Sequence, residues 1–282
     1  MSSTTRKRAA STAEASSSKG SRGKKQRLPD TCEWILREPA YRSWKNSNEG
    51  ASPVLWIHGP PGCGKTFLAQ FIVDDVQQEA AGSGTLAYFC DANSTPTSVI
   101  RSLLLQLLQF PELGNETKAI VTEAASEVSP GDHASPLDAT HRLWDTLSSV
   151  LPNLHNPTLV VDGVDEISGS HLQQLSFDLP SKLVELTETN DKSTKLLLSS
   201  RSESIIQRAM KDSPEILVTS ALVNEDLERF IQSEVMEYRE LDAWRDVVGT
   251  SILARSEGNF VWAALAIKSL ATEAPVSASA EE

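Results

Sequence analysis

The stretch WIHGPPGCGKTFLAQFI, residues 56–72, decides how this chain folds. Two apolar residues run into a loop of three glycines and two prolines, and a lysine, a threonine and an apolar-faced segment follow. Glycine lacks the Cβ atom that would keep the backbone away from a bound group, and it adopts positive φ without strain. A chain that concentrates such residues in front of one lysine is typical of a loop that wraps around an anion.

Four residues of this stretch, Gly59, Gly64, Lys65 and Thr66, fit the pattern G-x-x-x-x-G-K-[ST]. In that pattern the loop amides and the first turn of the next helix face phosphates, the lysine brings a positive charge, and the hydroxyl is offered to Mg²⁺. The alternative is a glycine-rich turn that happens to precede a helix, but four specified positions recur by chance in roughly one per cent of chains this long. The residues predicted to surround the phosphates are Gly59, Pro60, Pro61, Gly62, Cys63, Gly64, Lys65, Thr66 and Phe67.

An acidic segment, LVVDGVDE at residues 159–166, is predicted to complete the site. Its apolar strand delivers Asp162 to the carboxyl end of a sheet, which is where open α/β sheets bind ligands. We predict that Asp162 and Thr66 serve a Mg²⁺ ion, and that Asp165 or Glu166 orients or deprotonates an attacking water. The alternative is that these acids only end a strand and cap the next helix, which the glycine loop earlier in the chain disfavours.

A further apolar strand, KLLLSSRSES at residues 195–204, ends in Arg201. An arginine at the same sheet edge can reach a γ-phosphate and report whether it is present. A surface arginine that pairs with a neighbouring acid fits the sequence equally well. Both interpretations of Arg201 stay open at this point.

Short apolar strands alternate with amphipathic helices along most of the chain. Strands are predicted at residues 53–59, 85–90, 158–162, 195–200 and 215–220. Helices are predicted at residues 64–80, 97–110, 141–151 and 171–189, the last one interrupted near Pro180, and residues 111–136 are predicted to be a surface connection with one short helix. Because helices separate consecutive strands, the predicted fold class is α/β, with a mainly parallel sheet covered on both faces.

The predicted organisation has four parts. Residues 1–28 are too polar to bury a core and are predicted to be a disordered basic tail. An α/β domain is expected over residues 29–221, followed by a helical appendage over residues 222–271, because three helical patterns follow the fifth strand with no strand between them. Residues 272–282, rich in Ala, Ser and Glu, are predicted to be frayed.

The charge of the chain is asymmetric. Residues 1–27 hold eight Lys or Arg and one acid, whereas the remaining residues hold 18 Lys or Arg and 37 Asp or Glu. An acidic body disfavours broad contact with nucleic acid, which needs clustered positive charge. The basic clusters RKR and KKQR in the tail fit a two-part nuclear-import signal or a solvated tail.

The same composition gives an expectation for the compartment. No run approaches the ~20 apolar residues that a membrane helix needs, so no membrane contact is expected. The chain has three cysteines, and they show no paired metal-binding spacing, which favours a reducing compartment. We expect a cytoplasmic protein, with the nucleus as the alternative.

Three ordered motifs, the glycine loop, D-G-x-D-E and the apolar strand ending in SSR, resemble the signal-transducing P-loop NTPases of the NACHT class, within the STAND NTPases. The similarity extends to the nephrocystin-like N-terminal domain of fungal NOD-like receptors. TCEWILREPAYRSW (residues 31–44) resembles the lead-in to the loop in that family, and EGNFVWAALAIKSL (residues 257–270) resembles its closing helix. The resemblance covers residues 31–271.

The resemblance implies a five-stranded core in which the sensor strand lies between the strands that lead to Gly59 and to Asp162. It implies that ATP or GTP binds with Mg²⁺, that hydrolysis is slow, and that the bound nucleotide controls a switch. The phosphates would be held by Gly59, Gly62, Gly64, Lys65 and Thr66. Asp162 would serve Mg²⁺, Asp165 or Glu166 would position water, Arg201 would be the sensor, and residues 32–35 would border the nucleoside.

Members of that family carry an effector region before this domain and repeats after it, and neither is seen in this sequence. We therefore expect part of a NOD-like receptor, or a truncated form of one, a weak NTPase that acts with homotypic or trans protein partners. Two alternatives are a non-hydrolysing nucleotide-binding scaffold and a metabolic P-loop kinase. The kinase is disfavoured because residues 111–136, where a basic lid would lie, hold one basic residue, Lys118. A DNA-processing ATPase is disfavoured by the acidic body.

Overall fold

The structure is a computed structural model that describes residues 27–46, 51–79, 84–126, 136–167, 178–189 and 194–273. Most of the predicted basic tail and most of the predicted frayed C-terminus therefore lie outside the described residues. No helix in the described ranges is both long enough and apolar enough to cross a membrane.

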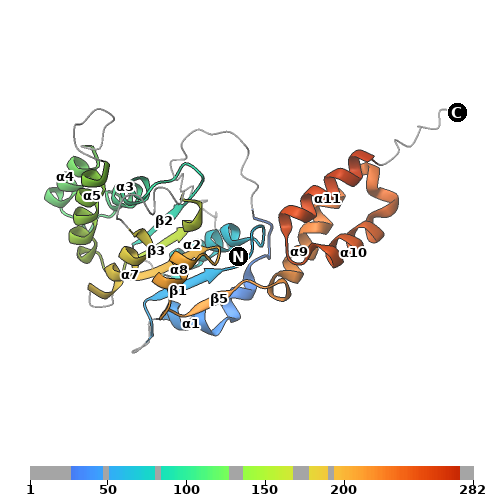
Figure 1. Ribbon diagram of the computed structural model, residues 1–282, viewed down its shortest axis with the longest axis horizontal. Helices are drawn as coiled ribbons and strands as arrows, with labels where there is room; N and C mark the ends of the chain where they lie inside the picture. Colours follow the sequence, from blue (N-terminus) through green and yellow to red (C-terminus); the bar gives the residue numbers. More distant parts are fainter. Residues whose placement is uncertain are drawn as a thin grey trace, which may run out of the picture.

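A five-stranded parallel sheet forms the centre of the molecule (Figure 1). Its strands are β1 (Val54–His58), β2 (Thr85–Phe89), β3 (Thr158–Asp162), β4 (Lys195–Ser200) and β5 (Glu215–Leu217). The strand order is β2-β3-β4-β1-β5. The predicted α/β fold class is confirmed, and β4 lies between β1 and β3, as the family resemblance implied.

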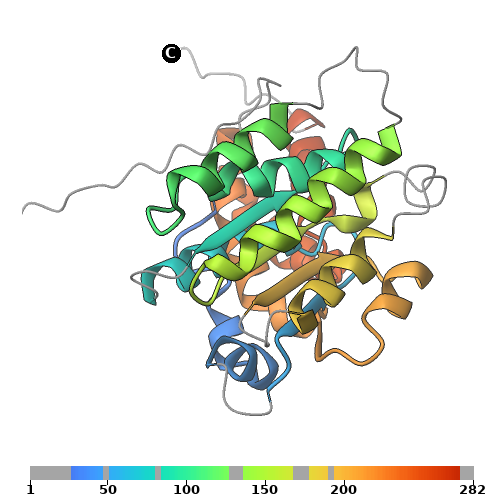
Figure 2. The ribbon, with the colours of Figure 1, turned by 90° about the vertical axis from the view of Figure 1, so that its left-hand side faces the viewer.

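Helices cover both faces of the sheet, which is why the strands read as continuous apolar runs. On one face lie a 3₁₀ helix η1 (Glu33–Arg37), α1 (Pro39–Asn46) and α2 (Lys65–Glu79). On the other face lie α3 (Pro96–Leu107), α4 (Asn115–Ser126), α5 (Pro136–Val150), η2 (Leu151–Asn153), α7 (Leu179–Thr189) and α8 (Ser204–Ala209). Figure 2 shows α3, α4 and α5 packed together over this face.

The structure refines three predictions for single elements. The one short helix expected within residues 111–136 is the twelve-residue helix α4, which buries Val121 and Ala125 against its neighbours. The interruption predicted near Pro180 is the start of α7, where the missing N–H of proline costs nothing, and residues 171–177 of the predicted helix lie outside the described residues. The fifth strand ends at Leu217 because Thr219 already caps the next helix through its side chain.

The edge strand β2 is protected by a side chain. Gln106 of α3 accepts a hydrogen bond from the amide of Ala87 at 2.9 Å and donates one to its carbonyl at 2.9 Å. An open strand edge pairs readily with other chains, so a side chain that occupies its polar groups guards against aggregation.

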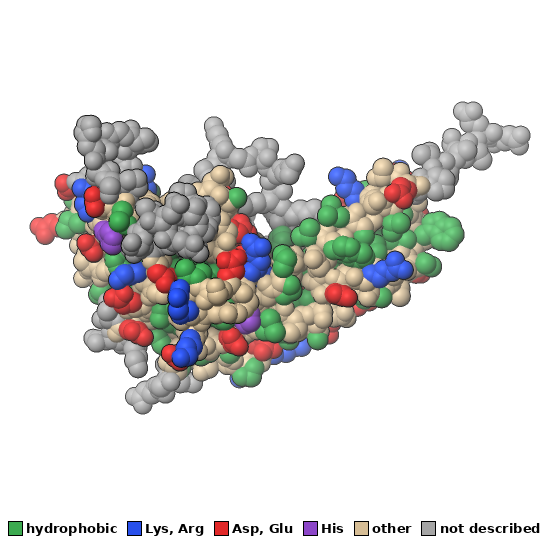
Figure 3. Space-filling model, viewed as in Figure 1, with side chains coloured by type: hydrophobic (Ala, Val, Ile, Leu, Met, Phe, Trp, Pro, Cys, Tyr) green, Lys and Arg blue, Asp and Glu red, His purple; other side chains and the backbone are tan. Residues whose placement is uncertain are grey.

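A helical unit follows the sheet and lies to its right in Figure 1. It consists of α9 (Ser220–Met236), η4 (Arg239–Trp244), α10 (Arg245–Ser256) and α11 (Phe260–Glu273). A separate core, built around Ile231, Ile252 and Ile267, holds these helices together. Hydrophobic side chains also gather on the outside of this unit (Figure 3). Trp244 and Trp262 of the same unit are exposed rather than packed in a core.

The helix α3 offers a matched test of the core. Leu103 is fully buried beneath it, whereas Leu105 on the same helix is 46% exposed. We expect Leu103→Ala to lower the free energy of unfolding by about 2–5 kcal/mol, because it removes buried methyl groups and leaves a cavity. Leu105→Ala is the control and should cost under about 1 kcal/mol. Urea unfolding followed by circular dichroism measures both, and equal losses would contradict this assignment of the core.

Candidate functional site

The glycine loop connects β1 to α2 and has the backbone shape that its composition predicts. Gly62 has φ +79° and Gly64 has φ +90°, values that side chains rarely adopt. A Cβ atom on Gly62 would lie 2.3 Å from Oδ1 of Asn259, so no larger residue fits there without movement. Within the described part of the chain, the amides of Gly62 and Gly64 donate to no backbone carbonyl, and they are available to an anion.

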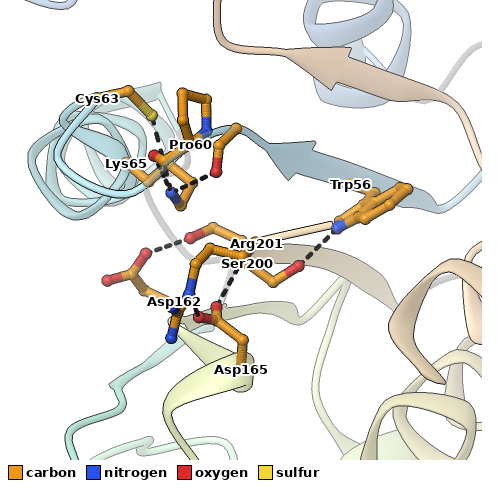
Figure 4. A network of polar contacts seen from close by, with 10 residues as sticks. Trp56, Pro60, Cys63, Lys65, Asp162, Asp165, Ser200 and Arg201 are labelled. Carbon is orange, nitrogen blue, oxygen red and sulfur yellow. Dashed lines mark hydrogen bonds and ion pairs between the residues drawn. The ribbon is translucent and has the colours of Figure 1, made fainter. Parts of the chain in front are cut away.

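The Lys65 side chain folds back across the loop (Figure 4). Its ammonium group donates to the carbonyls of Gly59 and Pro60, both at 2.9 Å, and lies 3.7 Å from Sγ of Cys63. Because α2 begins at Lys65, the unsatisfied amides of its first turn lie at the same place. The loop thus gathers a positive charge and free N–H donors.

The thiol of Cys63 is buried inside this loop. Burial raises the pKa of Cys63, although the nearby Lys65 ammonium opposes the shift. Cys63 is therefore protonated at neutral pH and acts as a packing residue.

Asp162 lies at the end of β3 and faces the loop. Its Oδ2 accepts a hydrogen bond from the hydroxyl of Thr66 at 2.7 Å, and its Oδ1 accepts one from the hydroxyl of Ser199. The carboxylate is 2% exposed, and burial raises its pKa, with the two hydroxyl bonds opposing the shift. A buried carboxylate that faces a hydroxyl oxygen suits Mg²⁺, because a bound cation would compensate a charge that is costly to bury.

The two acids after Asp162 have different surroundings. Asp165 binds Arg201 through both oxygens, at 2.8 Å to the backbone amide and 2.6 Å to Nε. Glu166 has exposed surface, and a partial loss of water around it, together with the charges of Asp165 and Asp162, raises its pKa. The sequence predicted Asp165 or Glu166 as the group that positions water. In this arrangement Glu166 is available for that role, whereas Asp165 is occupied.

Trp56 of β1 holds the end of β4 in place, next to Arg201. Trp56 donates from Nε1 to Oγ of Ser200 at 2.9 Å, and its ring stacks on His58 at 4.1 Å. His58 lies 3.3 Å from a carboxylate oxygen of Glu215, and burial lowers the pKa of His58. The histidine therefore serves the packing of the strand ends.

A pocket of about 490 Å³ adjoins the glycine loop. Its lining is mainly apolar and comes from the lead-in segment, the loop, α9 and α11. It includes Cys32, Trp34, Phe67, Phe230, Phe260 and Leu265. Asp226 of α9 accepts a hydrogen bond from the backbone amide of Cys32 at 2.8 Å, and this bond fixes the lead-in segment to the helical unit.

The start of α11 touches the loop directly. The amide of Phe260 donates to the carbonyl of Gly62 at 2.8 Å, and the ring of Phe260 lies 3.5 Å from where a Cβ atom of Gly64 would be. Asn259 caps the helix by accepting from the amide of Trp262 at 2.9 Å. Sequence reasoning missed these residues as part of the site, although the string GNF before an apolar helix is a helix-start signal that could have directed attention to them.

Comparison with known proteins yields a family match. The family model described as nephrocystin 3, N-terminal, matches residues 30–201. The curated protein "Vegetative incompatibility protein HET-E-1" of Podospora anserina is 25% identical over 264 residues, which are 86% of this chain and 18% of that protein. The chain thus spans under a fifth of this relative's length.

Solved structures show a more distant likeness. The Cdc6p structure from Pyrobaculum aerophilum has a TM-score of 0.47 and 14% identity, over 72% of this chain and 49% of that chain. The ORC2 protein of Aeropyrum pernix, described as ADPNP-ADP complexes, has a TM-score of 0.42 and 16% identity, over 86% of this chain and 68% of that chain.

The buried carboxylate of Asp162 predicts an unusual pH dependence. Its folded-state pKa is raised above the ordinary value of 3.8, so its contribution to stability is present at low pH and is lost as pH rises through the folded-state pKa. Asp162→Asn removes this cost. We therefore expect the variant to be more stable than the wild type at pH 7 and equally stable near pH 4.

Urea unfolding of both proteins between pH 4 and pH 7, without added metal, measures this difference. Both hydroxyls next to Asp162 can donate or accept, so the asparagine keeps its partners. If Asp162→Asn is less stable than the wild type at pH 7, or if the difference between the two proteins does not grow from pH 4 to pH 7, the assignment is contradicted.

Proposed function

Because this chain belongs to the nephrocystin 3 N-terminal domain family, we propose that it is a nucleoside-triphosphate-binding signalling switch of the NACHT/STAND type with slow Mg²⁺-dependent hydrolysis. The observation that carries this proposal is the pairing of the glycine loop with the end of β3, where Thr66 contacts Asp162 at 2.7 Å. A glycine loop and a buried carboxylate, which would hold phosphate and Mg²⁺ respectively, meet at one sheet edge.

The loop supplies the phosphate contacts in this proposal. The amides of Gly62 and Gly64 would donate to phosphate oxygens, because neither donates to another backbone group among the described residues. The start of α2 would add its positive dipole end. Lys65 would exchange its two carbonyl partners for the β- and γ-phosphates. Thr66 and Asp162 would hold Mg²⁺, directly or through a water, and this ion would neutralise charge on the phosphates.

The nucleoside would occupy the pocket beside the loop. The pocket is large enough for a base and a ribose, and its aromatic lining, which includes Trp34 and Phe67, provides flat surfaces. Cys32 and Trp34 of the lead-in segment line one wall, so they would border the nucleoside. Because α9 and α11 form the opposite wall, nucleotide binding would join the helical unit to the sheet. Adenine and guanine both fit this proposal.

Glu166 is the group that we assign to hydrolysis. Burial and the neighbouring charges of Asp165 and Asp162 raise its pKa, which makes this carboxylate a stronger base than an ordinary glutamate. As Glu166 takes a proton from water, the water oxygen bonds to the γ-phosphorus and the bond to the β–γ bridging oxygen breaks. The products are a nucleoside diphosphate and inorganic phosphate.

Two alternative functions can be distinguished from this proposal by what happens to the γ-phosphate. A non-hydrolysing scaffold would bind nucleotide without releasing phosphate. A metabolic kinase would transfer the phosphoryl group to a small molecule and usually needs a basic lid, but residues 111–136 hold one Lys or Arg, Lys118. We propose that the nucleotide state controls binding of a homotypic or trans protein partner. We also propose a cytoplasmic or nuclear location.

Removal of the Lys65 charge tests nucleotide binding. We expect Lys65→Ala to weaken binding of a fluorescent ATP or GTP analogue by about a hundredfold or more, because charge-assisted contacts to phosphate are lost. Circular dichroism should be unchanged. Lys118→Ala, on α4 at a distance from the loop, is the matched control and should bind as the wild type does. Wild-type affinity in the Lys65 variant would reject the site.

Substitution of Glu166 separates hydrolysis from binding. Glu166→Gln should slow phosphate release by about 10²–10⁴-fold, since a general base is lost, and should leave nucleotide affinity within about twofold. Release of inorganic phosphate is measured under single-turnover conditions, with Glu123→Gln on the exposed side of α4 as the control. If Glu166→Gln hydrolyses at the wild-type rate, its assigned role is wrong.

A further inference from the structure

We propose that Asp165 is a positioning residue that holds Arg201 with its terminal guanidinium nitrogens presented to a γ-phosphate, so that the chain distinguishes a nucleoside triphosphate from a diphosphate. The inference rests on the proposed function, because it concerns the same nucleotide.

Asp165 is committed to Arg201 by its geometry. One oxygen accepts from the backbone amide of Arg201 at 2.8 Å, and the other accepts from Nε at 2.6 Å. The Asp165 side chain is only 4% exposed. A carboxylate that is buried and engaged through both oxygens cannot also take a proton from water, so its role is exerted through the arginine.

Arg201 keeps its outer nitrogens available. Its side chain is 48% exposed, and its two terminal nitrogens make no hydrogen bond within the described ranges. The guanidinium group is planar and carries donors along two edges, so one edge can bind a carboxylate while the other binds phosphate. The bond to Asp165 through Nε leaves the outer edge for phosphate.

The position of this pair fits the end of a triphosphate. Arg201 follows β4 by one residue, and β4 lies between β1, which leads to the loop, and β3, which ends at Asp162. The hydroxyl of Ser199, two residues before Arg201, already binds Asp162. Figure 4 shows Arg201 and Asp165 at the same edge as Asp162, with Lys65 facing them across the site.

Orientation of the arginine has an energetic consequence. A free, half-exposed arginine loses rotamer entropy when it is fixed. Asp165 fixes the side chain before the nucleotide arrives, so its contact with phosphate becomes more favourable. A diphosphate has no third phosphoryl group, so its affinity should be insensitive to Asp165.

The experiment compares affinities for two ligands. A non-hydrolysable triphosphate analogue and the matching diphosphate, each with Mg²⁺, are titrated against a fluorescent nucleotide bound to the full chain. Asp165→Asn keeps the shape of the side chain but places an N–H group against a donor of Arg201. We expect the preference for triphosphate over diphosphate to fall about tenfold in Asp165→Asn and in Arg201→Gln. The double variant should fall no further than Arg201→Gln alone.

A matched control is Glu203→Gln. Glu203 is exposed and lies close enough to raise the pKa of Arg201, but the structure shows no hydrogen bond between the two side chains in the described residues. Glu203→Gln should keep the wild-type preference for triphosphate. This control distinguishes an effect of the arginine's orientation from an effect of removing a nearby negative charge.

Several results would overturn the inference. These are an equal loss of both affinities in Asp165→Asn, a gain in triphosphate preference, an unchanged preference in Arg201→Gln, or additive effects in the double variant. Thermal melting of each variant identifies unfolding, and the exposed Arg201→Gln substitution carries the test if Asp165→Asn does not fold. A wild-type chain that binds neither ligand would reject the proposed function itself, whereas wild-type binding with these variant results would reject this inference alone.

Discussion

One hydrogen bond, from the hydroxyl of Thr66 to the carboxylate of Asp162, joins two segments that are 96 residues apart in the sequence. It forms because β1, β4 and β3 run parallel in adjacent positions, so their carboxyl ends meet at one edge. The same edge receives Ser199 and Arg201 from β4. The parallel strand order is thus the constraint on which the whole site depends.

The sequence predicted the sheet and the glycine loop well, because both depend on local signals. Apolar runs mark buried strands, and the positive φ values of Gly62 and Gly64 explain why glycine is needed there. The helix α4 was predicted only as one short helix without bounds, because it buries only Val121 and Ala125, too few for a clear periodic pattern. The separate roles of Asp165 and Glu166 were also out of reach, since adjacent acids differ only through tertiary contacts.

The helical unit contributes to the site through contacts that local patterns do not reveal. The amide of Phe260 binds the carbonyl of Gly62, and Asp226 binds the amide of Cys32. The glycine loop, the first turn of α2, the lead-in segment and the helical unit therefore meet around one pocket. A ligand in that pocket would touch all four, so its presence would bias how the helical unit sits against the sheet, which is the physical requirement for a switch.

The central claim is that backbone amides of the glycine loop, with Lys65, hold a polyphosphate. Hydrogen exchange of the backbone amides in residues 62–66, measured with and without a Mg²⁺–nucleoside triphosphate, tests it most directly. The account predicts slower exchange in this loop when nucleotide is present, because the amides then donate to phosphate oxygens. Unchanged exchange of these amides at saturating nucleotide would contradict it.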